Sequence, residues 1–410
     1  MNTTHDLERD LGRWMEEVAP RRAPQDLASI VVERTRSMRP RPGWLARLME
    51  PPMNTTLLFG RGRIAGQPAS LILLALLLLA LIVGVVAVGS QLLRRPTLPP
   101  PFGVAGNGLM AANVGGQILV MQPDGAGVRP LDLPFTGLTG ISFSRDGTKL
   151  AAWSTPDQGS QAELSLIVAN VDGSGAFEVE PGTGISRPDG TVGRIEWSPE
   201  DRRLAFSDGA DTLYVADIDE RRIRAIGTPD KARRDPAWSP DGRLAYRCEL
   251  SDGSLHLCVM DADGTREQVL ETSPGTLWAF QGSSWSPDGK HIAYTVDDGS
   301  GYDVATIDVD TGQERILTGQ TAVHTIFPLW TPDGEHVVFA SGIVRADGSG
   351  LRIYEDGGCS SMEPSPDGRF VACLTEDRLL LWPVDGGEPT TIRLEGAGDG
   401  DDVSWQRVGG

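Results

Sequence analysis

Trp238-Ser-Pro-Asp-Gly242 is the stretch that decides the fold, because it recurs as Trp285-Ser-Pro-Asp-Gly289 and Trp330-Thr-Pro-Asp-Gly334. The weaker copies of this motif are Phe143-Ser-Arg-Asp-Gly147, Trp197-Ser-Pro-Glu-Asp201 and Pro364-Ser-Pro-Asp-Gly368. A short apolar segment follows each copy, as Leu244-Ala-Tyr246 follows the first. Proline presets φ for a turn, and Asp-Gly supplies the left-handed conformations that a hairpin needs. Each copy therefore predicts a strand, a tight turn and a second strand.

A second turn recurs seven times, at intervals of 37 to 48 residues, with alternating strands before and after most copies. Its copies are Asp124-Gly125, Asp172-Gly173, Asp219-Glu220, Asp263-Gly264, Asp310-Thr-Gly312, Asp347-Gly348 and Asp385-Gly386. Each unit then has four antiparallel strands, which we call A to D from the inside outward. Internal repeats of this length are typical of propellers, so we predict an all-β fold, a seven-bladed β-propeller.

The two turns differ in number, and this difference predicts how the ring closes. Seven C–D turns accompany only six A–B turns, and the first unit begins without an A strand. The last segment, Asp402-Val-Ser-Trp405, looks like an A strand with nothing after it. We therefore expect the C-terminal strand to complete the first blade, which leaves no long open sheet edge. Six blades stay open as an alternative, because the unit over 331–356 is short.

The Trp-Ser-Pro-Asp-Gly units resemble the WD-repeat-like propeller repeats of the TolB type, over residues 108–408. The repeated tryptophans are expected to build blade packing rather than a site, and they are Trp197, Trp238, Trp285, Trp330 and Trp405. The resemblance therefore says much about the fold and little about the function.

Charge divides the chain into two unlike parts. Residues 1–69 carry 11 arginines against 8 acidic residues, whereas the chain after Arg95 carries 24 basic against 48 acidic residues. Because nucleic acid and anionic membrane surfaces would repel so acidic a domain, we expect no nucleic-acid partner.

A membrane helix is predicted over residues 70–93. No charged residue occurs from Ile64 to Leu93, and Leu71 to Val88 is apolar throughout. About 20 such residues match the roughly 30 Å hydrocarbon core of a bilayer. A cleaved signal peptide is the alternative, but 69 residues precede the run and the run is longer than a usual signal segment. The proline-rich stretch 94–107 is expected to be a stalk that holds the propeller, 108–410, away from the membrane.

The tail, residues 1–69, has apolar residues at helical spacing and is expected to form short amphipathic helices. Its basic character favours a cytoplasmic location, with the propeller outside the cytoplasm. The order of tail, membrane helix and outer domain is similar to that of membrane-bound anti-sigma factors. The tail has no cysteine and only His5, so it cannot form the zinc cluster of one version of that family.

The four cysteines form two local pairs around predicted turns. Cys248 and Cys258 flank the turn 251–254, and Cys359 and Cys373 flank the turn 365–368. Residues equidistant from a hairpin turn lie opposite one another, within reach of a disulfide. We therefore predict two cross-strand disulfides, with four buried free thiols as the alternative. Disulfides would put the propeller in an oxidising compartment.

We expect the protein to have no catalytic activity and to bind neither a metal ion nor a cofactor. The repeats also resemble the propellers of prolyl-oligopeptidase-type hydrolases, but those enzymes carry a separate domain with a serine nucleophile elbow, which this chain lacks. The turns at Asp261 and Asp308 lack the further ligands of an EF-type calcium loop.

Ligands are expected on the face of the D–A and B–C connections, which vary in length, notably 154–162 and 181–193. Four residues that precede A strands are candidates for the ligand mouth, namely Arg194, Asp235, Gln281 and His324. The sequence thus predicts a non-catalytic, membrane-anchored propeller that binds a protein, peptide or cell-envelope ligand. The alternative is a signalling regulator, with the propeller as sensor and the tail bound to a cytoplasmic factor.

Overall fold

In the computed structural model, all described residues belong to one compact unit, 92–410. The described residues are 100–155, 164–182, 185, 194–227, 232–270, 282–297, 301–319, 326–354, 358–375, 378–394 and 402–409. The predicted tail, the predicted membrane helix and residues 94–99 of the stalk lie outside these ranges. Among the described residues, there is no helix with the length and apolar character to cross a membrane.

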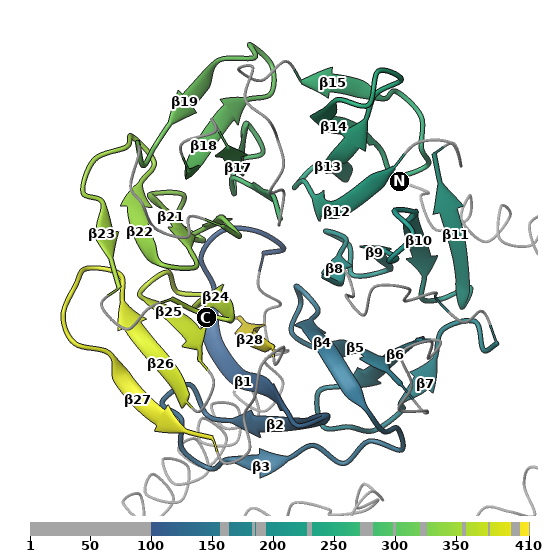
Figure 1. The fold of residues 1–410 in the computed structure, drawn as a ribbon. Coiled ribbons are helices and arrows are strands. Elements are labelled where there is room, and N and C mark those ends of the chain that lie inside the picture. Colours follow the sequence, from purple (N-terminus) through teal and green to yellow (C-terminus); the bar gives the residue numbers. More distant parts are fainter. Residues whose placement is uncertain are drawn as a thin grey trace, which may run out of the picture. The chain divides into compact units, whose positions relative to one another are not determined.

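Within the described ranges, the strands form seven four-stranded antiparallel sheets arranged as a ring (Figure 1). In blades 2 to 7 the strands follow chain order, with A innermost. Blades 2 to 4 comprise β4 (Leu138–Phe143), β5 (Lys149–Ser154), β6 (Ser165–Asn170) and β7 (Phe177–Glu178); β8 (Glu196–Trp197), β9 (Arg203–Ser207), β10 (Leu213–Asp217) and β11 (Arg222–Ile226); and β12 (Arg233–Trp238), β13 (Arg243–Glu249), β14 (Leu255–Asp261) and β15 (Gln268–Leu270).

Blades 5 to 7 repeat this pattern. They comprise β16 (Ser284–Trp285), β17 (His291–Asp297), β18 (Tyr302–Asp308) and β19 (Glu314–Ile316); β20 (Leu329–Trp330), β21 (His336–Phe339), β22 (Gly342–Arg345) and β23 (Arg352–Ile353); and β24 (Ser361–Pro364), β25 (Phe370–Leu374), β26 (Arg378–Pro383) and β27 (Thr390–Arg393). The prediction of seven blades is confirmed, and the short sixth unit forms a full blade.

Blade 1 confirms the predicted closure, because its A strand comes from the C-terminal end of the chain. It comprises β28 (Val403–Val408), β1 (Gly106–Val114), β2 (Gln117–Met121) and β3 (Arg129–Pro130), in that order. Trp405 pairs with Met110, and both side chains are buried. Gly108 leaves room for a side chain at this seam, because a Cβ there would lie 2.6 Å from Oε1 of Gln406 and would displace it. The same oxygen accepts a hydrogen bond from the backbone N–H of Leu109.

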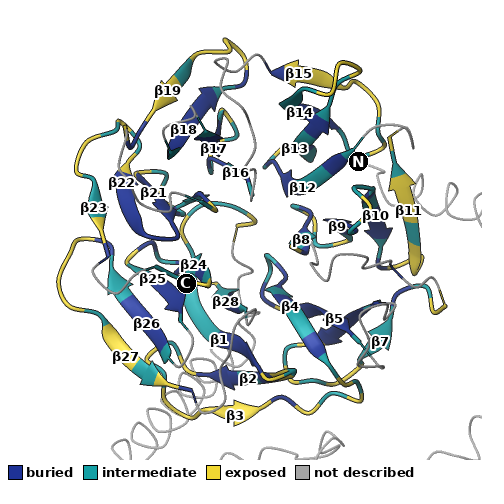
Figure 2. Cartoon of the chain, in the orientation of Figure 1, coloured by how far each residue is buried: buried dark blue, intermediate teal, exposed yellow. Residues whose placement is uncertain are grey.

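The core lies between the blades, where buried side chains of neighbouring sheets pack together. Figure 2 shows that the buried residues are concentrated in the inner strands. The D strands β11, β15, β19 and β27 are mostly exposed. Three repeated tryptophans join neighbouring blades, since their indole N–H groups donate to carbonyl oxygens of the preceding A strand at 3.0–3.1 Å. These bonds run from Trp197 to Ser142, from Trp238 to Glu196 and from Trp285 to Ala237.

The repeated turn residues are structural, as the motif predicts. In the turn of blade 5, the hydroxyl of Ser286 donates to Asp288, and the backbone N–H of His291 donates to Oγ of Ser286. Asp308, considered above for calcium, accepts hydrogen bonds from the backbone N–H and the hydroxyl of Thr311. These contacts are the local hydrogen bonds typical of such turns.

Both predicted disulfides are confirmed, although neither joins directly opposed residues. Cys248 and Cys258 lie 5.8 Å apart at Cα, and Cys359 and Cys373 lie 5.2 Å apart. In the strand register Cys258 faces Tyr246, and Cys373 faces Met362. Tyr246 is two residues from Cys248 and Met362 is three residues from Cys359, so the true hairpin centres are displaced from the midpoints between the cysteines.

Residues 100–105, at the end of the predicted stalk, contact the propeller instead of holding it away from the membrane as a free spacer would. Strand β1 begins at Gly106, two residues before the expected start of the propeller. Residues 100–105 run into the centre of the ring rather than away from it (Figure 1). The backbone N–H of Ala105 donates to the carbonyl of Pro366 in the A–B turn of blade 7. Proline stiffness predicts extension, but it does not reveal which surface an extended segment contacts.

Candidate functional site

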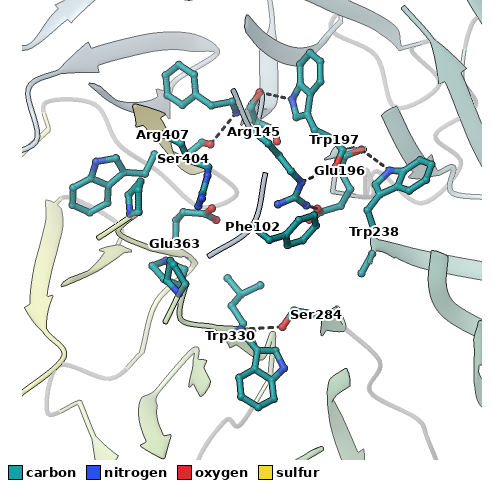
Figure 3. A pocket seen from close by; sticks show the side chains of 18 of the residues that line it. Phe102, Arg145, Glu196, Trp197, Trp238, Ser284, Trp330, Glu363, Ser404 and Arg407 are labelled. Atoms are coloured by element: carbon teal, nitrogen blue, oxygen red, sulfur yellow. Dashed lines mark hydrogen bonds and ion pairs between the residues drawn. The ribbon is translucent and has the colours of Figure 1, made fainter. Parts of the chain in front are cut away.

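A central cavity, which we call the channel, lies inside the ring, and all seven A strands contribute to its wall. The unfilled space between the side chains is about 1080 Å³, part of it open to solvent. Figure 3 shows the charged and aromatic residues that converge on it. The residues used in the following argument are Phe102, Arg145, Arg194, Glu196, Glu363, Asp402 and Arg407.

Arg194 is the centre of the charges in the channel. Its guanidinium lies 3.2 Å from a carboxylate oxygen of Glu196 and 2.5 Å from one of Glu363. Burial alone would lower the pKa of Arg194, but the carboxylates of Glu363, Glu196 and Asp402 together raise it. Burial raises the pKa of Glu363, against the opposing effect of Arg194. Since the Arg194 side chain is 45% exposed, this ion-paired group remains accessible from the channel.

Arg145 lies deeper and joins blades 2 and 3. Its Nε donates to the carbonyl of Trp197 at 3.0 Å, and its guanidinium lies 3.4 Å from Glu196. Burial lowers the pKa of Arg145 from its usual value. The carboxylate of Asp201 accepts hydrogen bonds from the backbone N–H groups of Arg145 and Asp146 at 2.6 and 2.8 Å. Burial raises the pKa of Asp201 to about 6.

Both residues depart from the repeat motif in their blades. Arg145 occupies the position of the motif proline, and Asp201 occupies that of the motif glycine, with a φ of 55°. The contact between them was not predicted. The signal that could have revealed it is the replacement of two turn residues by charged ones in consecutive copies.

The chain's own segment 100–105, which we call the strap, occupies the end of the channel beside the A–B turns. The Phe102 ring lies beneath the Arg145 guanidinium, with 4.0 Å between the guanidinium carbon and the ring centroid. Nη2 of Arg407 donates to the carbonyls of Pro100 and Gly103 at 3.0 and 2.6 Å. Figure 3 shows Phe102 projecting into the centre of the channel. The strap therefore reduces access from this end.

The four residues predicted for the ligand mouth have different outcomes. Arg194 lines the channel, as expected. Asp235 is not part of that lining; burial raises its pKa to about 6, against the opposing charges of Arg247 and Arg234. Gln281 and His324 lie outside the described residues, as do most of the connections 154–162 and 181–193. Glu196 and Glu363 were not predicted from the sequence. They lie in the A strands β8 and β24, and both form ion pairs with Arg194.

One cluster in the described part of the chain has suitable atoms for a metal ion. Ligand atoms of Asp333, Glu335 and His336 lie within 4.8 Å of one another. The two carboxylates are exposed, and Asp333 already accepts hydrogen bonds from Thr331 and from the backbone N–H of Glu335. These turn contacts account for the arrangement of the acidic residues without a metal ion.

Comparisons with known proteins agree with the fold. The family model described as the TolB beta propeller domain matches residues 115–346. An uncharacterized protein of Agrobacterium fabrum is 25% identical over 249 residues, which cover 52% of this chain and 80% of that protein. A TolB homologue of Chlorobium luteolum is 30% identical over 121 residues, 29% of this chain and 27% of the homologue.

An uncharacterized peptidase of Bacillus subtilis is 28% identical over 156 residues, which cover 37% of this chain and 22% of the peptidase. A crystal structure of a functionally unknown protein from Desulfotomaculum acetoxidans superimposes with a TM-score of 0.52 at 13% identity, covering 72% of this chain and 99% of that one. Such low identity shows the fold alone. The family match, by contrast, spans more than half of the sequence and includes the Trp-Ser-Pro-Asp-Gly repeats. This chain belongs to the TolB beta propeller domain family.

Proposed function

We propose that this protein is a non-catalytic, membrane-anchored propeller that binds a protein, peptide or cell-envelope ligand outside the cytoplasm. The observation that carries the proposal is the channel, where Arg194 and Glu363 form an accessible ion pair while the strap fills the other end. A ligand would enter from the face of the D–A connections and exchange contacts with these charges. Charged groups held in a concave site supply specificity more than affinity.

Anchoring and location are part of the proposal. The apolar run 70–93 has the length of a membrane span, and the tail 1–69 has a net positive charge. The disulfides Cys248–Cys258 and Cys359–Cys373 support an oxidising compartment, since cytosolic thiols are kept reduced. These features together favour a cytoplasmic tail and an outer propeller.

Crosslinking in intact cells tests the proposed binding site. Cells expressing the full chain are treated with formaldehyde, and adducts are purified and identified by mass spectrometry. Arg194→Glu reverses a channel charge, and Arg224→Glu is the matched control, because Arg224 lies on the exposed outer strand β11. We expect one partner to be recovered with the wild type and with Arg224→Glu and to be lost with Arg194→Glu. Equal recovery with all three would refute the channel as the ligand site.

The alternative function, a regulator whose tail binds a cytoplasmic sigma-type factor, rests on the order of the segments in the sequence. Purification of partners on immobilised residues 1–69 distinguishes the two functions. Specific recovery of a sigma-type factor supports regulation, with the propeller as its sensor. Recovery of none supports a plain anchor.

A further inference from the structure

A contact between neighbouring blades recurs at the first residue of the B strand. The Arg243 guanidinium lies over the ring of Trp285, with 5.1 Å from its carbon to the ring centroid, and its Nε donates to Asp241 at 2.9 Å. One blade earlier, Arg203 lies over Trp238 at 5.0 Å, and its Nε donates to Glu200 at 3.0 Å. In both blades a guanidinium fills the space between a tryptophan and the acidic residue of its own A–B turn.

Between blades 5 and 6, the equivalent tryptophan, Trp330, and the equivalent acidic residue, Asp288, are present, but the arginine is not. His291 occupies the position of Arg243, and its ring centroid lies 6.3 Å from that of Trp330. Its Nε2 lies 3.7 Å from Asp308, an acidic residue at the end of β18. Asp288 keeps the turn contact with Ser286 that Asp241 makes with Ser239. The imidazole is shorter than an arginine side chain and does not reach across the space.

A groove lies at this place, between blades 5 and 6, with an unfilled volume of about 950 Å³. The residues that define its character are Asp288, His291, Asp308, Gln313, Trp330 and Asp333. The groove is acidic, because three carboxylates face one permanent cation, Arg315, whose guanidinium contacts the carbonyl oxygen of Asp347 at 3.4 Å. The indole N–H of Trp330 is buried and has no hydrogen-bond partner.

We propose that this groove binds an arginine side chain of a partner protein or peptide. The guanidinium would stack on Trp330 and pair with Asp288, in the place that Arg243 fills one blade earlier. A planar guanidinium suits this site better than an ammonium group, because it can stack and pair at the same time.

A titration monitored by NMR tests the site directly. The full chain is labelled with ¹⁵N at the tryptophan indoles, purified in detergent micelles and titrated with N-acetyl-arginine amide. N-acetyl-citrulline amide is the control ligand, since it has nearly the same shape without the charge. The signal of Trp330 is identified by its loss in Trp330→Phe. We expect this signal to shift saturably with the arginine compound and to change little with the citrulline compound.

Two exchanges between the blades complete the test. His291→Arg supplies the groove with an internal guanidinium and should weaken binding about two- to fivefold, the effect of one exposed cation–π contact. Arg243→His should open the equivalent space over Trp285 and give the signal of that indole a new saturable response. Each variant introduces the residue that the chain already has at the equivalent position of the neighbouring blade. Melting curves show whether both variants are folded. No saturable shift, an equal response to citrulline or unchanged binding in His291→Arg would overturn the proposal.

Discussion

Trp405 lies in the strand that closes the ring and packs between blades 1 and 7. It is 4% exposed and packs in a cluster with Met110, Leu379 and Leu381, which come from blades 1 and 7. Its indole N–H has no hydrogen-bond partner, so the contribution of this side chain is packing. Replacing a buried aromatic residue by alanine costs about 3–5 kcal/mol, through lost burial and the cavity that remains. We therefore expect Trp405→Ala to lower the free energy of unfolding by this amount.

The expected change in melting temperature follows from the size of the propeller. For a large domain each kcal/mol corresponds to roughly 2–4 °C, so the variant should melt roughly 10 °C below the wild type. The assay is thermal unfolding of the full chain in detergent, followed by near-ultraviolet circular dichroism. Val128→Ala is the control, because Val128 is 43% exposed, and it should melt within about 2 °C of the wild type.

A second measurement separates ring closure from ordinary core packing. A chain truncated after residue 401 should melt at least as low as Trp405→Ala, because it loses the pairing of β28 with β1 as well. A synthetic peptide of residues 398–410 should restore part of the loss, and the same peptide with Trp405→Ala should not. A truncated chain that melts with the wild type would refute closure by the C-terminal strand.

Three further predictions concern the strap, the disulfides and pH. Phe102→Ala and Arg407→Ala should release residues 100–105, so limited proteolysis should cut there faster than in the wild type; unchanged cutting would contradict the strap's contacts with Arg145 and Arg407. Replacing either cysteine pair by serine opens a loop closed over 10 or 14 residues and should cost about 3 kcal/mol per pair in chain entropy; denaturant unfolding measures this, and a cost below about 1 kcal/mol would refute it. Burial raises the pKa values of Asp201 and Asp235 to about 6. Between about pH 4 and 6 these carboxyl groups are therefore protonated in the folded state and ionised in the unfolded state. The free energy of unfolding decreases as pH rises through that range. Asp235→Asn should therefore gain stability relative to the wild type as pH rises from 4 to 7, and a constant difference would contradict the burial of that carboxylate.

The ring was predictable because its information is local and repeated. Five of the six A–B turns have a serine or threonine, an aspartate and a glycine a few residues apart. A count of the turns was enough to assign β28 to blade 1. The cysteine pairs were predictable for the same reason, since each pair flanks one hairpin. The offset between the two cysteines of each pair could not be predicted, because it depends on the register of that hairpin.

The channel was predictable only in part, because its charges come from segments far apart in sequence. Arg194 was identified as a residue before an A strand, but Glu363, 169 residues away, reaches it only through the geometry of the ring. The strap was missed because nothing in a proline-rich sequence says which surface it contacts. Arg145 and Asp201 were visible as departures from the motif, yet only the packing of blades 2 and 3 explains them.

Location of the propeller outside the cytoplasm is the central claim, and thiol labelling of intact cells tests it most directly. Single cysteines are introduced by Val128→Cys on the exposed surface of the propeller and by Thr3→Cys in the tail. A membrane-impermeant maleimide is added before or after permeabilisation. The account predicts that residue 128 is labelled in intact cells and that residue 3 is labelled only after permeabilisation. Labelling of residue 3 in intact cells, with residue 128 protected, would contradict it.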